Sequence, residues 1–507
     1  MDPSASPEPE LDPGQGTSTP VAFRAVRGAF WVMLNSYWTI GFGFVANIVL
    51  TRLLDPNAYG TFALAVFFSQ LLRVQPKLGL GYAFAQHKQN TGRLVGTYIP
   101  TELATATSGL LLSCLAVPIL LGLGYAPLVV QVSVILSIAA MTEGLAGMGI
   151  TLCDKELLFS QTSLIQSVVL PVSYAPAFWL ASHGGGVWSL VAQTMTYSAL
   201  LMIGTWWIVY RRLTFLWKLE WLFDRRLAVQ MASFGITVGV ALLASMLLAQ
   251  LDNFMIGTFV GAAALGFYDR AYRTAQWPST LLSSLLSRTV FYTYAHLRDD
   301  ITRLSKTVTM VMWLLVMLAL PLAVLLFIIA PDLVALLYGE RWMPSALFMR
   351  ILVVYSVVRP LSDNAGALFI ATGKPGLMTK FTLLQVLVLL AAGLPLTLTW
   401  GAVGTSVAVG LAFGVGLILV YRSITRAIPV KLWSILGLPA LVSLLTLTGY
   451  LALSRLTGLN DMALPIRIVL KATYAVTTFF TLTFITQPRS TLERIHYVWR
   501  LARMADD

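Results

Sequence analysis

Apolar stretches of about 20 residues follow one another along the chain, with short polar segments between them. A helix of about 20 residues crosses the hydrocarbon core of a bilayer, because each residue adds about 1.5 Å along the axis. The pattern predicts an all-α, polytopic membrane protein with about fourteen transmembrane helices. The predicted spans are 29–51, 59–84, 97–121, 127–150, 159–181, 187–209, 231–256, 264–293, 307–330, 344–371, 377–399, 403–421, 433–453 and 463–486.

The composition excludes a soluble enzyme and a nucleic-acid-binding protein. Only 11% of the 507 residues are charged and 57% are hydrophobic, whereas soluble domains carry roughly 25% charged residues. The net charge is +12. The basic residues lie in the short gaps between apolar runs, and they form no basic stripe with interleaved aromatic residues. That distribution is typical of membrane topology signals.

The basic residues also predict which side of the membrane each loop occupies. Cytoplasmic loops are enriched in Lys and Arg. With a cytoplasmic N-terminus, the cytoplasmic segments hold 22 of the 34 Lys and Arg residues, and the opposite side holds only Arg52, Arg341 and Arg455. We therefore expect a multi-pass membrane protein with both termini in the cytoplasm.

The spans divide into two halves joined by a polar linker. Residues 211–230 mix Arg and Lys with Trp and Phe, as in an interfacial helix. The predicted organisation is a disordered cytoplasmic tail (1–23), an N-lobe with helices 1–6 (24–210), an interfacial linker (211–230), a C-lobe with helices 7–12 (231–421), helices 13–14 (422–487) and a cytoplasmic amphipathic tail (488–507).

A weak internal repeat supports the two halves. The connection between spans one and two aligns without gaps with that between spans seven and eight, so that Ala58 matches Ala264 and Gly60 matches Gly266. Six spans separate the copies, so both halves have the same orientation in the membrane. A parallel repeat of this kind places a binding site between the halves.

Charged residues inside spans are candidates for the site, because a charge in the bilayer is costly unless it faces a wet cavity or a partner. The candidates for an anion-binding cavity are Arg73, Lys77, Arg270, Arg273 and Arg359. Arg288 and Arg350 are also embedded, against only four embedded acids, namely Glu143, Asp252, Asp269 and Asp363. Guanidinium groups suit phosphate oxygens, so we expect an anionic ligand such as a diphosphate.

Two alternatives remain for these charges. The pairs Asp269–Arg273 and Arg359–Asp363 have the four-residue spacing of helix-stabilising ion pairs. Among the acids, Asp252, Glu143 and Asp363 are candidates for coupling transport to protons or Na⁺.

No cofactor, metal site or ATPase is predicted. The two cysteines and four histidines share no ligand spacing. The nearest approach to a phosphate loop runs from Gly366 to Gly373-Lys374, and Pro375 stands where Ser or Thr is required. We therefore expect a secondary transporter and not an enzyme.

Three motifs resemble those of a known family. QLDNFMIG at 250–257, ALGFY at 264–268 and AYR at 271–273 are similar to the signature of bacterial polysaccharide flippases, the Wzx-type members of the polysaccharide-transport family in the MOP superfamily. LLDP at 53–56, GLG at 79–81 and ATGKP at 371–375 are similar too. The sequence departs from the family at 291–294, where FYTY replaces a common Phe-Pro.

The resemblance covers roughly residues 24–490 and implies a function in the bacterial inner membrane. It implies a V-shaped, two-lobed fold with a central cationic cavity that alternates between inward-open and outward-open states. The implied cargo is a polyprenyl-diphosphate-linked oligosaccharide for O-antigen, capsule or exopolysaccharide synthesis. The implied partners are membrane lipids, a polysaccharide polymerase and a chain-length regulator. Arg273 is the cavity residue that the motif itself contains.

Two other functions fit a chain with this many spans. A multidrug or cation antiporter of the same superfamily would favour acidic cavity residues, whereas this chain favours basic ones. A membrane-embedded polysaccharide polymerase or ligase would carry a large outer loop, whereas the longest outer loop here is 331–343. The sequence therefore favours the flippase.

Overall fold

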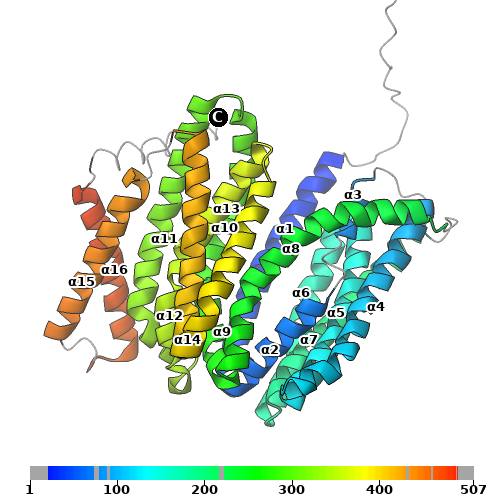
Figure 1. The fold of residues 1–507 in the computed structure, drawn as a ribbon, viewed down its shortest axis with the longest axis horizontal. Helices are drawn as coiled ribbons and strands as arrows, with labels where there is room; N and C mark the ends of the chain where they lie inside the picture. Colours follow the sequence, from blue (N-terminus) through cyan, green and yellow to red (C-terminus); the bar gives the residue numbers. More distant parts are fainter. Residues whose placement is uncertain are drawn as a thin grey trace, which may run out of the picture.

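Every regular element in the described part of the chain is helical (Figure 1). The computed structural model describes residues 21–73, 79–87, 92–214, 216, 222–429, 433–457, 461–486 and 488. Eleven helical segments among these residues are long and apolar enough to cross a membrane. The prediction of an all-α, polytopic membrane protein is confirmed. The predicted site residue Lys77 lies outside the described residues, as do nearly all of the two predicted tails.

The N-lobe consists of the helices that precede the linker. They are α1 (Val21–Leu53), α2 (Pro56–Leu72), α3 (Leu80–Ala85), α4 (Gly92–Gly122), α5 (Pro127–Lys155), α6 (Phe159–Ser182) and α7 (Val187–Arg212). Within the lobe, α5 packs against α4 and α7, and α1 packs against α6.

The C-lobe repeats this arrangement with more helix breaks. Its helices are α8 (Arg225–Phe259), α9 (Ala262–Ala275), α10 (Trp277–Leu297), α11 (Ile301–Leu337), the short η3 (Glu340–Trp342), α12 (Ser345–Leu352), α13 (Val354–Ala371) and α14 (Gly376–Ala427). The packing of α8 on α14 matches that of α1 on α6. After the π-helix η4 (Trp433–Gly437), helices α15 (Leu438–Leu456) and α16 (Leu464–Thr486) pack against α11.

The second helix of each lobe is broken, which the hydropathy pattern does not predict. The span expected at 59–84 is divided into α2 and α3, because α2 ends at Arg73 in an extended conformation. The span expected at 264–293 is divided into α9 and α10, and Pro278 stands in the first turn of α10. Proline lacks the N–H that a continuous helix needs.

Three further boundaries differ from the predicted spans. The span at 344–371 is divided into α12 and α13. The spans at 377–399 and 403–421 form one element, α14, whose backbone is non-helical at Gly401 (φ 60°). Helix α8 begins at Arg225, inside the predicted linker, because the Asp224 carboxylate accepts the N–H of Arg226 at 2.8 Å and caps the helix. Residues 215 and 217–221 of the remaining linker lie outside the described residues.

Two glycines let the lobes touch backbone to backbone where α2 crosses α9. A Cβ atom on Gly60 would lie 1.7 Å from the carbonyl oxygen of Ala262, and one on Gly266 would lie 1.9 Å from that of Pro56. The contact is reciprocal, since Gly60 aligns with Gly266 and Pro56 with Ala262 in the internal repeat. A two-fold pseudo-symmetry axis therefore passes through this crossing.

Hydrogen bonds join the lobes at the same end of the molecule. The indole Nε1 of Trp342 donates to the carbonyl oxygen of Thr51 at 3.0 Å, and the hydroxyls of Tyr125 and Thr258 lie 3.0 Å apart. Arg52 donates to the carbonyl oxygens at the end of α11. The lobes are thus held together at the predicted outer end.

The hydrophobic cores show the same difference between the two ends. The largest core crosses from one lobe to the other and contains residues of α2, α8, α9 and η3. At the predicted cytoplasmic end, one core lies within the C-lobe around α10, α11 and α13. A separate core joins α3, α4 and α7 of the N-lobe to Met231 near the start of α8. Figure 1 shows the lobes meeting at the lower end and diverging toward the upper end, except that the first part of α8 lies across the upper end of the N-lobe and contacts α3 and α4.

Candidate functional site

A cavity of about 460 Å³ lies between the lobes, directly above the α2–α9 crossing. The first helix of the N-lobe, α1, forms one wall. The end of α9, the start of α10 and Tyr338 of the C-lobe form the other wall. The cavity therefore lies at the lobe interface, where the internal repeat predicts a binding site.

Arg273 is the cationic side chain that the cavity exposes. It lines the wall from α9, and 54% of its side chain is accessible. Its Nε atom lies 3.0 Å from each oxygen of the Asp269 carboxylate, so one side of the guanidinium group is fixed. The donors on the remaining nitrogens leave this group able to bind an anion.

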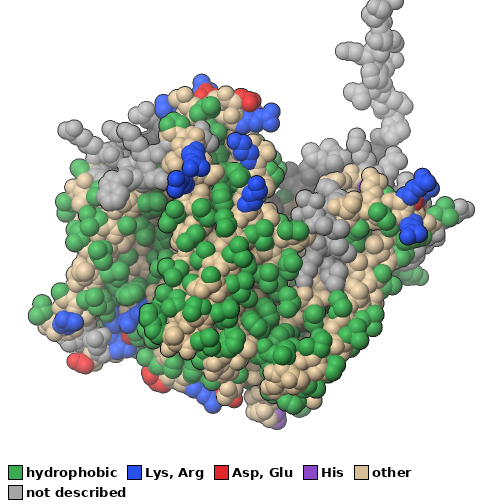
Figure 2. All heavy atoms as spheres, viewed as in Figure 1, with side chains coloured by type: hydrophobic (Ala, Val, Ile, Leu, Met, Phe, Trp, Pro, Cys, Tyr) green, Lys and Arg blue, Asp and Glu red, His purple; other side chains and the backbone are tan. Residues whose placement is uncertain are grey.

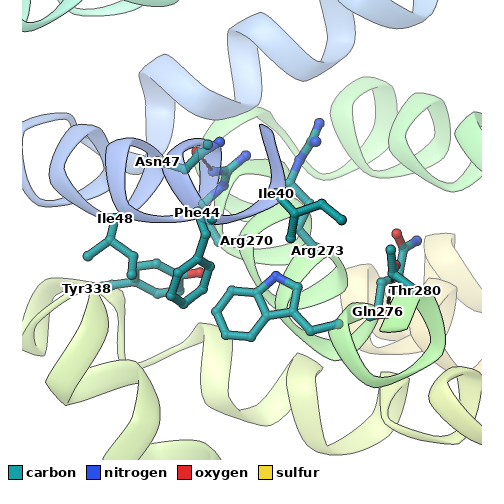
Figure 3. Close-up of a pocket in the computed structure, with 12 residues that line it drawn as sticks. Ile40, Phe44, Asn47, Ile48, Arg270, Arg273, Gln276, Thr280 and Tyr338 are labelled. Carbon is teal, nitrogen blue, oxygen red and sulfur yellow. Dashed lines mark hydrogen bonds between the residues drawn. The ribbon is translucent and has the colours of Figure 1, made fainter. Parts of the chain in front are cut away.

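Arg270 also lines the cavity, but its guanidinium group is held by the protein. The residue is only 5% exposed. Its Nη2 donates to Asp269 at 2.5 Å, its Nη1 donates to Asn47 of α1 at 2.6 Å, and the group lies 4.1 Å from the ring centre of Tyr59. Figure 3 shows Arg270 directed toward Asn47, whereas Arg273 extends away from Tyr338. Arg270 thus connects the two lobes.

The rest of the cavity wall is amphiphilic. Ile40, Phe44 and Ile48 of α1 supply an apolar surface, and the rings of Phe44 and Trp277 meet edge to face with their centres 4.3 Å apart. Gln276 and Thr280 supply an amide and a hydroxyl group on the opposite wall (Figure 3). Among the described residues that line this cavity there is no Asp or Glu. A ligand with an anionic part and an apolar part fits this lining.

The other predicted cavity arginines lie elsewhere. Arg73 stands at the break after α2 and pairs with Glu143 of α5 at 2.9 Å, within the N-lobe. Arg359 donates to the hydroxyl of Tyr355 and lies 3.4 Å from Asp363 on the same helix. Neither arginine lines the cavity. The structure therefore brings together Arg270 and Arg273 but not Arg73 or Arg359.

The three predicted ion-coupling acids are all engaged by protein groups. Asp252 of α8 is buried and accepts the hydroxyl of Tyr268 at 2.5 Å and the backbone N–H of Asn253 at 2.8 Å. Glu143 and Asp363 form the ion pairs just described. No cluster of three or more potential metal ligands occurs among the described residues.

Several site residues were missed by the sequence interpretation. Asn47, Trp277 and Gln276 carry no charge, so a search for embedded charges passes over them. The signal for Asn47 was its position as a polar residue within a long apolar run. The partnership of Asn47 with Arg270 joins residues 223 positions apart, and no local spacing predicts it.

The fold and the site define a class of protein. Two pseudo-symmetric helical lobes enclose a cationic cavity between them in a chain of membrane-spanning helices, which is the architecture of a two-lobed multi-pass transporter. Residues 49–347 match the family model described as polysaccharide biosynthesis protein. The match covers more than half of the chain, so the protein belongs to this family, and its fold is that of the MOP superfamily.

Two curated relatives are similar over much of the chain. The teichuronic acid biosynthesis protein TuaB of Bacillus subtilis (strain 168) is 24% identical over 59% of this chain and 61% of its own length. The lipopolysaccharide biosynthesis protein WzxC of Escherichia coli (strain K12) is 21% identical over 73% of this chain and 74% of its own length. The alignment with TuaB thus spans less than two thirds of that relative.

A solved structure shares the fold. The lipid II flippase MurJ in an inward closed conformation superposes with a TM-score of 0.72, over 90% of this chain and 99% of its own length, at 12% sequence identity. This similarity confirms the predicted fold, and the family match confirms that the chain belongs to a polysaccharide biosynthesis family.

Proposed function

We propose that this protein is an inner-membrane flippase that moves an anionic polyprenyl-diphosphate-linked oligosaccharide from the cytoplasmic to the outer leaflet. The product would serve O-antigen, capsule or exopolysaccharide synthesis, and both termini would face the cytoplasm. The observation that carries the proposal is Arg273, a half-exposed guanidinium group on the wall of a cavity between two lobes.

The chemistry of the cavity supports an amphiphilic anionic cargo. Arg273 would bind a phosphate oxygen, since a guanidinium group offers several donors in a fixed plane. Gln276 and Thr280 would accept or donate hydrogen bonds to polar parts of the headgroup. The apolar wall of α1 would lie against the first units of the lipid chain.

The two ends of the molecule support alternating access. The lobes are joined at the predicted outer end by the Gly60–Gly266 crossing and by hydrogen bonds of Trp342, Tyr125 and Arg52. At the other end, the core around α10, α11 and α13 lies within the C-lobe. A cavity above such a junction would receive cargo from the cytoplasmic side. Opening the junction would then release the cargo outward.

The lining argues against a cation antiporter with the same fold. An organic cation would need a carboxylate in the cavity, and the described residues that line it include none. Asp269 lies behind the wall, where Arg270 and Arg273 already neutralise it. The cavity is therefore suited to an anion.

Replacing Arg273 with Ala tests the function in cells. We expect Arg273→Ala to abolish surface polysaccharide while the amount of protein in the membrane stays unchanged, and Arg273→Lys to retain part of the activity because it keeps the charge. Arg422→Ala, which removes an exposed arginine at the end of α14, is the matched control. Surface polysaccharide and lipid-linked intermediates would be quantified in a deletion strain carrying each variant. Normal polymer from Arg273→Ala would refute the proposal.

A further inference from the structure

A second cavity lies far from the lobe interface, at the predicted cytoplasmic end of the C-lobe. Its volume is about 380 Å³. The connection between α10 and α11, the connection between α13 and α14, and the last turns of α14 surround it. None of its lining residues belongs to the cavity that holds Arg273.

Three basic side chains surround the mouth of this cavity. They are Arg298, Lys374 and Arg426, each from a different segment of the chain. All three are exposed, and no Asp or Glu is among the described residues that line the cavity. Figure 2 shows Lys and Arg side chains gathered at the upper end of the C-lobe, above a largely hydrophobic surface.

The acidic residues nearest in sequence do not neutralise these basic side chains. Asp299 lies 3.5 Å from Arg298, but both side chains are mostly exposed, and such pairs contribute little. Asp300 is engaged elsewhere, because its carboxylate accepts the backbone N–H of Arg303 at 3.0 Å and caps α11. The cavity mouth therefore keeps an excess of positive charge.

The interior of the cavity is apolar. Leu304, Leu368 and Ile424 are buried and form its floor, and Ile301 and Leu377 extend the apolar surface toward the mouth. Hydroxyl groups of Thr372 and Ser423 lie among the lining residues. A simple phosphate ion would leave this apolar surface uncovered, whereas a lipid would place an acyl chain against it.

We propose that this cavity binds an anionic membrane phospholipid, with its phosphate among Arg298, Lys374 and Arg426 and the start of an acyl chain on the apolar floor. Basic pockets between transmembrane helices at the cytoplasmic surface are suited to anionic headgroups. The site ties the lipid composition of the inner leaflet to the C-lobe, since the bound lipid contacts both connections that hold α10, α11, α13 and α14 together.

The test measures lipid binding to the full-length protein. Purified, delipidated protein would be titrated with phosphatidylglycerol and with phosphatidylcholine of identical acyl chains, and bound lipid would be counted by native mass spectrometry. The test variant is Arg298→Gln/Lys374→Gln/Arg426→Gln. The matched control is Arg211→Gln/Arg212→Gln/Arg225→Gln, which removes three exposed charges at the linker instead.

We expect phosphatidylglycerol to bind more tightly than phosphatidylcholine. Each basic residue near an anionic lipid contributes roughly fivefold in affinity, so the test variant should lose about 100-fold and the control almost nothing. Inorganic phosphate at millimolar concentration should leave the lipid bound. Equal binding of both lipids, an equal loss in the control, or complete displacement by inorganic phosphate would each overturn the proposal. These outcomes do not involve Arg273 and leave the proposed transport function unaffected.

Discussion

Helices α2 and α9 occupy equivalent positions in the two lobes, yet they carry different residues. Both follow the first helix of their lobe, both carry the glycine of the crossing, and both end in a break. The buried face of α2 is largely apolar, and its first basic residue is Arg73 at the C-terminal end. Helix α9 carries Asp269, Arg270 and Arg273 within its last two turns.

The two repeated helices therefore share one role, the contact between the lobes, and differ in a second, the charges that they carry. The shared glycines form a symmetric contact that closes the predicted outer end, so both copies are needed for it. The charges are asymmetric, so the residues that we propose to bind the anion belong to the C-lobe, and the N-lobe contributes Asn47 and the apolar wall of α1.

The largest effect is expected from a methyl group at the crossing. Gly60→Ala and Gly266→Ala each place a Cβ atom less than 2 Å from a backbone carbonyl oxygen, which the partner helix cannot avoid without moving. We expect the clash at the junction to lower the free energy of unfolding of each variant by about 3 kcal/mol or more. Each variant should also abolish polysaccharide export. Gly410→Ala is the control, because a Cβ atom there has nothing within 4 Å.

The two glycine variants should behave alike. Thermal unfolding in detergent and surface polysaccharide would be measured for both. If only one of them were impaired, the reciprocal contact would not be the basis of the closed outer end.

A loss of similar size is expected from the charged cluster of α9. Asp269→Asn leaves the buried guanidinium group of Arg270 without a charge partner and should cost about 3–5 kcal/mol of stability. Glu143→Gln breaks the Arg73 pair of the N-lobe, where half of the Glu143 side chain is exposed, and should cost about 0–1 kcal/mol. Unfolding midpoints of the purified variants measure both, and equal losses would contradict the proposed asymmetry.

A small effect is also expected from the hydrogen bonds that join the lobes. Trp342→Phe removes the bond to the carbonyl oxygen of Thr51, and Tyr125→Phe removes the bond to Thr258. Each loss should cost about 1 kcal/mol, and more at Trp342, which is buried and leaves a carbonyl group unpaired. A double variant should show the sum of the two, because the sites do not share partners. Unfolding free energies of the single and double variants provide the measurement.

The sequence predicts the helices of this protein well and their breaks poorly. Mean hydropathy is set by many residues together, so it locates long apolar segments well. Each predicted span corresponds to helical structure in the described part of the chain. Each break depends on one or a few residues: Arg73 is extended at the end of α2, and Pro278 stands at the start of α10. Single residues barely change the mean hydropathy of a 20-residue window.

The site was predictable only where its contacts are local. The ion pair of Asp269 with Arg273 follows from their spacing of four residues on one helix. The surroundings of Arg270 and Arg273 differ because of how the lobes pack. Arg270 is held by Asn47 of α1, whereas Arg273 faces the cavity. The same packing decides that Arg73 and Arg359 lie outside the cavity.

Binding of a polyprenyl diphosphate to the purified protein tests the central claim most directly. Titration of wild type and Arg273→Gln, with the uncharged polyprenol as a control ligand, would isolate the contribution of this guanidinium group. We predict that Arg273→Gln weakens diphosphate binding by about tenfold or more and leaves polyprenol binding unchanged. Equal affinity of both proteins for the diphosphate would contradict the account.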